Sequence, residues 1–131
     1  MFREAQRLGG PMRITQGSYS TGVSASAGTH NGGGVLDLST RGLTRSQINR
    51  RVRALRTVGF AAWHRTPADG FSSHIHAVAV KCPDLAPLAA LQVVDLRRGR
   101  NGLRGHGLDR HRGMGIKVRS WEAYKRMRDS Q

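Results

Sequence analysis

The stretch that decides the fold reads FAAWHRTPADGFSSHIHAVAV, at residues 60–80. Its two apolar runs, 60–65 and 74–80, are rich in small, aromatic and β-branched residues, which is typical of strands. The polar segment between them contains Pro67 and Gly70 and has the length of a wide hairpin. The sequence therefore predicts two neighbouring antiparallel strands near the middle of the chain.

The segments on either side predict further strands and helices. The clearest helix carries Ile48, Val52 and Leu55 at i, i+4 and i+7, follows a capping Thr44 or Ser46, and ends before a glycine. The other expected elements are strands at 14–20 and 35–39, a Gly/Ser/Ala-rich loop at 21–34, and helices at 84–96 and 121–127. This order predicts the α+β class, with a small antiparallel sheet and flanking helices.

Length and composition favour one domain with a modest core. The chain has 131 residues, of which 37% are hydrophobic, and domains most often have ~100–150 residues. We expect a lead-in at 1–13, the folded domain at 14–96, and a basic arm with a short helix at 97–131. The single cysteine, Cys82, excludes an internal disulfide and a zinc site made of cysteines.

The charge of the chain predicts attraction to polyanions. The formal net charge is +14, and half of the 22 Lys and Arg residues lie in the arm at 97–131. Anionic cell-wall polymers and nucleic acids are both polyanions that could bind such a chain. The arm lacks aromatic residues placed between its cations for base stacking and matches no nucleic-acid-binding motif, so a merely solvated arm is an equally good interpretation.

Three residues in this sequence form a candidate zinc site. Residues i and i+2 of a strand face the same way, so His74 and His76 project from one side of the second hairpin strand. His30 leaves the glycine-rich loop, and Asp37 follows on the strand at 35–39. Taken alone, the pair His74 and His76, or the pair His30 and Asp37, more often has a structural role than a metal-binding one. Together, His30, Asp37 and His76 match the nitrogen and oxygen ligands of catalytic zinc, which takes three protein ligands and a water.

His74 is then expected beside the metal. A bound ion lowers the pKa of its water towards ~7. An imidazole with an ordinary pKa near ~6.5 can exchange protons with that water and with a leaving group. We therefore expect His74 to be catalytic.

The spacing His-x6-Asp followed by His-x-His resembles the zinc metallopeptidases of the lysostaphin-type, D-Ala-D-Ala peptidase-type and Hedgehog-like group, over roughly residues 14–80. The segment SAGTHNGGGVLDLS is most similar to the D-Ala-D-Ala carboxypeptidase branch. The resemblance implies one zinc ion held by His30, Asp37 and His76, with His74 as an active-site group. It also implies that Gln16 binds a substrate carbonyl or the oxyanion.

By this resemblance the chain is expected to hydrolyse peptide bonds of peptidoglycan, in a stem peptide or cross-bridge, as a D,D-carboxypeptidase or an endopeptidase. No apolar run has the length of a membrane helix or of a signal peptide. We therefore expect holin- or particle-mediated delivery to the wall, as for a phage lysin, or a longer parent chain.

One departure from the family keeps other functions open. The D-Ala-D-Ala branch usually carries a glutamate base shortly before its last zinc ligand, whereas residues 70–75 contain none. Asp69, in a Pro/Gly loop, is interpreted as a turn residue, which leaves proton transfer to His74. The alternatives are a zinc protein without catalysis, as among Hedgehog-like proteins, and a particle protein that binds polyanions or nucleic acid.

Overall fold

The computed structural model describes residues 1–19 and 28–131. Its centre is a four-stranded antiparallel sheet with the strand order β1-β2-β4-β3. The strands are β1 (Ile14–Gln16), β2 (Val35–Ser39), β3 (Phe60–Arg65) and β4 (His74–Ala79). The predicted α+β class and the β3–β4 hairpin are confirmed, with β3 at one edge of the sheet.

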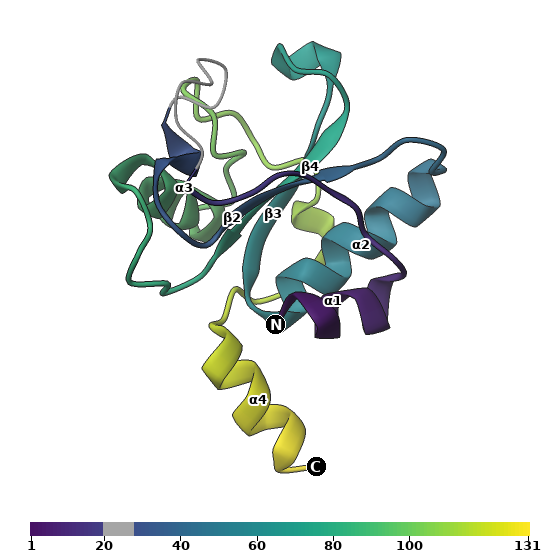
Figure 1. The fold of residues 1–131 in the computed structure, drawn as a ribbon, viewed down its shortest axis with the longest axis vertical. Coiled ribbons are helices and arrows are strands. Elements are labelled where there is room, and N and C mark those ends of the chain that lie inside the picture. Colours follow the sequence, from purple (N-terminus) through teal and green to yellow (C-terminus); the bar gives the residue numbers. More distant parts are fainter. Residues whose placement is uncertain (20–27) are drawn as a thin grey trace.

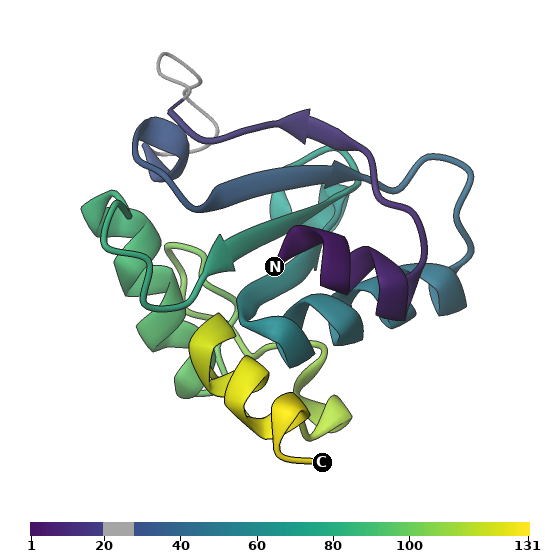
Figure 2. The same cartoon turned by 60° about the horizontal axis from the view of Figure 1, so that its bottom comes forward.

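Helices cover both faces of the sheet (Figures 1 and 2). They are α1 (Phe2–Gly9), α2 (Arg45–Val58), α3 (Pro87–Arg97) and α4 (Trp121–Asp129), with short 3-10 turns at Thr29–Asn31, Pro67–Asp69 and Arg112–Met114. Helices α1 and α2 lie side by side under one face, and α3 lies against the other. Each face therefore has its own apolar cluster, and the side chains that point to α3 share their face with the candidate zinc ligands.

Helix α2 shows how local sequence sets this arrangement. The Thr44 hydroxyl accepts a hydrogen bond from the Gln47 backbone N–H, and the Gln47 side chain accepts one from the Thr44 N–H, so Thr44 is the cap. Val52, Leu55 and Val58 are fully buried against the sheet. The helix ends at Gly59, whose φ of 124° suits glycine and whose missing side chain leaves room for the α4 backbone.

Some elements differ from the expectation. The strand expected at 14–20 ends at Gln16, and the loop expected at 21–34 contains a 3-10 turn at Thr29–Asn31; residues 20–27 lie outside the described residues. Helix α3 begins at Pro87 rather than at 84, because the fixed φ of proline suits the first helical turn. Helix α1 lies in the segment interpreted as a lead-in, and its Ala5 is fully buried.

Part of the basic segment at 97–131 packs into the domain. Residues 99–109 fold back on themselves, with the Asn101 N–H donating to the Gly107 carbonyl and the Asp109 N–H donating to the Gly99 carbonyl. The Trp63 indole donates to the Arg100 carbonyl at 3.1 Å. This folded loop forms one wall above the sheet face that carries the candidate zinc ligands. Within the described residues, no helix is both long and apolar enough to cross a membrane.

Candidate metal centre

The pairing of β2 with β4 brings two of the expected ligands together. Asp37 and His76 are directly opposed in the register, so both side chains leave the same face of the sheet. His30 reaches them from the turn at Thr29–Asn31. Asp37 Oδ1 lies 3.2 Å from His30 Nε2 and 3.0 Å from His76 Nδ1. One ligand atom from each of the three residues lies within 4.8 Å of the other two.

The hydrogen bonds of His30 fix which of its ring nitrogens faces the cluster as an acceptor. Its Nδ1 lies 3.0 Å from the Gly17 carbonyl oxygen, which can only accept a hydrogen bond. The Nδ1 atom therefore carries the proton. In the neutral ring the Nε2 lone pair then points at Asp37, and the ring is 1% exposed.

His76 is oriented in the same way by a residue on α3. Its Nε2 lies 2.7 Å from Gln92 Oε1, while the Gln92 amide nitrogen donates to the Gly102 carbonyl at 3.0 Å. Because that carbonyl can only accept, the amide cannot be flipped, and His76 must donate through Nε2. The neutral His76 ring therefore also turns a lone pair, on Nδ1, towards Asp37.

Three acceptors thus converge on one point, which is electrostatically unfavourable unless a cation lies among them. Zinc accepts two imidazole nitrogens and one carboxylate oxygen, and the partners of zinc-bound histidines are typically carbonyl oxygens like those of Gly17 and Gln92. The residues present therefore fit a zinc ion with an open fourth position.

The ionisation of Asp37 and His76 agrees with this assignment, whereas His30 must give up a proton. Burial disfavours a charged Asp37, but its contacts with His30 and His76 outweigh burial and hold its pKa well below the usual range. Burial also opposes charge on His30, yet the hydrogen bond and charge of Asp37 raise the pKa of that ring. Burial lowers the pKa of His76. A carboxylate and a neutral His76 are the forms that bind a metal, and binding of an ion at His30 would release the proton that Asp37 favours there.

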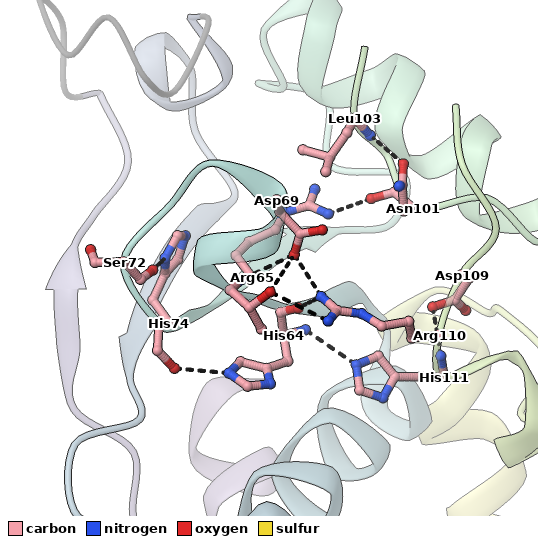
Figure 3. A network of polar contacts seen from close by, with 12 residues as sticks. His64, Arg65, Asp69, Ser72, His74, Asn101, Leu103, Asp109, Arg110 and His111 are labelled. Carbon is pink, nitrogen blue, oxygen red and sulfur yellow. Dashed lines mark hydrogen bonds and ion pairs between the residues drawn. The ribbon is translucent and has the colours of Figure 1, made fainter. Parts of the chain in front are cut away.

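His74 lies beside the cluster. Its Nδ1 is 2.7 Å from the Ser72 carbonyl oxygen, so that nitrogen donates (Figure 3). Its Nε2 lies 3.7 Å from Asp37 Oδ1. The side chain is 16% exposed, so the Nε2 lone pair can be reached from the cleft. His64, by contrast, is opposite Ile75 in the register and projects from the other face of the sheet.

Asp37 and His76 line a cleft of about 900 Å³, with the buried His30 behind them. Its walls come from β1, from the β3–β4 loop and from the loop at 101–107, and they include Gln16, His74 and Arg65. Gln16 is opposite Asp37 in the β1–β2 pairing. A peptide in this cleft would lie next to the ligands and to His74 at the same time.

Asp69 is not available as a base in the position of the missing glutamate. Its carboxylate accepts hydrogen bonds from the Thr66 backbone at 3.0 Å and from Arg110 at 2.6 Å (Figure 3). These bonds make it the turn residue that the sequence predicts, and tie the β3–β4 loop to the C-terminal segment.

The structure therefore brings the expected ligands His30, Asp37 and His76 to one point, with His74 beside them and Gln16 in the wall of the same cleft. Sequence reasoning missed Gln92 and Arg65. A comparison of the chain with models of known protein families, with curated proteins and with solved structures finds no match.

Proposed function

We propose that this protein is a zinc-dependent peptidase that cleaves peptide bonds of bacterial peptidoglycan. The observation that carries the proposal is the convergence of the His30 Nε2 and His76 Nδ1 lone pairs on the Asp37 carboxylate, with both tautomers fixed by hydrogen bonds. The sheet-face position leaves one side of this cluster open to a cleft. Such an open site is typical of catalytic rather than structural zinc.

The residues around the cluster suit hydrolysis of an amide. A zinc ion held by His30, Asp37 and His76 would polarise the scissile carbonyl and make hydroxide available near neutral pH. His74 Nε2 accepts the proton of the attacking water and delivers it to the leaving amine, while the Ser72 carbonyl holds the ring in orientation. The Gln16 amide donates to a substrate carbonyl in the same cleft.

Two observations favour peptidoglycan over other peptides. The spacing of the ligands and the His-x-His pair resemble the peptidases of cell-wall peptides, and a net charge of +14 draws the protein to anionic wall polymers. No glutamate lies at residues 70–75, so in this proposal His74 alone performs the proton transfers.

His74→Ala is expected to keep one zinc per chain and to lower the rate of peptidoglycan hydrolysis by ~10²–10⁴-fold, the usual contribution of a general acid–base group. The assay is mass spectrometry of purified peptidoglycan after digestion, with zinc content measured on the same samples. The matched control is His106→Ala, whose side chain is 70% exposed. It should retain wild-type activity.

Chelator treatment of the wild type should stop the release of peptide fragments, and zinc should restore it. If the protein binds one zinc per chain but hydrolyses no peptidoglycan, the result would favour the alternative of a zinc protein without catalytic activity. Salt-dependent nucleic-acid binding that survives the chelator, with no zinc bound, would favour the polyanion-binding alternative.

A further inference from the structure

Two buried side-chain donor atoms have no hydrogen-bond partner within residues 1–19 and 28–131. They are Gln16 Nε2 and Arg65 Nη2, and both residues line the same cleft. Buried polar groups are nearly always hydrogen-bonded, and exceptions call for a functional explanation. Both atoms are hydrogen-bond donors, so the ligand that pairs with them must offer oxygen acceptors.

Of these two residues, Arg65 gives the stronger indication of a ligand because it carries a charge. The residue is 3% exposed, its guanidinium carbon lies 4.9 Å from the centre of the Trp63 ring, and its Nη1 donates to the Asn101 carbonyl (Figure 3). It forms no ion pair with any carboxylate of the described residues. Burial lowers the pKa of Arg65 to about 10, so the group remains charged at neutral pH. The charges of Asp69 and Asp37 act on Arg65 without forming an ion pair and do not offset its burial, so an anionic ligand would lower the cost of this buried charge.

The strand order places Arg65 on the far side of the metal cluster from Gln16. Gln16 is on β1 and Arg65 is on β3, with the ligands of β2 and β4 between them. Arg65 is opposite His74 in the β3–β4 pairing. Neighbouring strands lie ~4.8 Å apart, and one extended residue spans ~3.5 Å. If a peptide lies across the strands with its scissile carbonyl at the cluster, a group one or two residues from that carbonyl therefore reaches Arg65.

We propose that Arg65 is a specificity-determining residue that binds a carboxylate of the substrate within one or two residues of the scissile bond. This inference rests on the proposed peptidase function. The carboxylate is either the free C-terminus of the peptide or an acidic side chain such as that of a glutamate residue. Gln16 binds the uncharged carbonyl on the opposite side of the cluster.

The test compares each carboxylate peptide with its amide. One pair is diacetyl-Lys-D-Ala-D-Ala with a free or an amidated C-terminus, and the other is an L-Ala-D-Glu peptide with a free or an amidated glutamate carboxylate. The wild type is expected to hydrolyse the acid of one of these two pairs with a ~30–100-fold higher kcat/KM than the matching amide. This ratio corresponds to the free energy of one charge-assisted hydrogen bond. In Arg65→Gln the acid-to-amide ratio should fall to about 1, and Arg65→Lys, which keeps the charge, should retain part of the preference.

Arg104→Gln is the matched control, since Arg104 lines the cleft but is exposed. It should preserve the ratio. The pair that shows the preference identifies the source of the carboxylate. Equal hydrolysis of acid and amide by the wild type, or an equal loss on both in Arg65→Gln, would overturn the role of Arg65 and leave the peptidase function standing.

If the wild type hydrolyses neither pair, the proposed function fails instead. Calorimetric binding of the same four peptides to the zinc-loaded protein then tests Arg65 separately. Tighter binding of one acid that is lost in Arg65→Gln supports the carboxylate site, and equal binding of acids and amides contradicts it.

Discussion

Replacing His76 by alanine is expected to weaken zinc binding by far more than ~100-fold. In the proposed site His76 is one of three ligands and is fixed by Gln92, and loss of even such an outer hydrogen-bond partner typically costs 10–100-fold in metal affinity. The measurement is a zinc titration in competition with a chromophoric chelator. The remaining His30 and Asp37 should leave only weak, pH-dependent binding.

His64→Ala is the matched control for that experiment. His64 belongs to the neighbouring strand and bonds Ser73 at 2.8 Å, but it projects from the opposite face of the sheet. It should bind zinc as tightly as the wild type. A His76→Ala protein that retained wild-type affinity would show that the ion lies elsewhere.

Asp109→Ala is expected to lower the free energy of unfolding by about 3–5 kcal/mol, the usual result of removing one partner of a buried ion pair. The Asp109 carboxylate accepts two hydrogen bonds from Arg56, at 2.8 and 3.0 Å, and the two side chains are 2% and 5% exposed. The Arg56 Nε also donates to the Ala62 carbonyl of β3. Truncation therefore leaves a buried guanidinium without its counter-ion. Urea unfolding at neutral pH measures the loss.

Asp129→Ala provides the control for stability. Asp129 also pairs with an arginine, Arg128, but its side chain is 66% exposed and solvent screens the pair. Its removal should leave the urea midpoint unchanged. If Asp109→Ala behaved like this control, the contact between α2 and the loop at 99–109 would not contribute to the stability of the domain.

Strand alternation and capping made much of the fold predictable. The apolar runs at 60–65 and 74–80 fixed the hairpin, and the period of two placed His74 and His76 on one face. The sequence predicted the start of α2 at Thr44 or Ser46, and the capping box in the structure identifies Thr44. Helix α1 was missed because Gly9, Gly10 and Pro11 suggest a loop, although Phe2, Ala5 and Leu8 recur at helical spacing.

The residues that surround the candidate ligands were harder to predict from the sequence. Gln92 is on α3, and which residue of a helix meets a given sheet position depends on how the helix packs, which no local pattern fixes. Arg65 could have been found, because it follows Trp63 by two residues on a strand and so shares its face with His76. Its burial, however, depends on the loop at 99–109 folding back over the sheet.

Zinc-edge X-ray absorption of the wild-type protein loaded with one zinc ion tests the central assignment most directly. The structure predicts a first shell of nitrogen and oxygen at ~2.0–2.1 Å, with the multiple scattering of two imidazoles and no sulfur at ~2.3 Å. This pattern corresponds to His30, Asp37, His76 and one solvent oxygen. A sulfur ligand from Cys82, a shell without histidine, or a protein that retains no zinc at micromolar metal would contradict it.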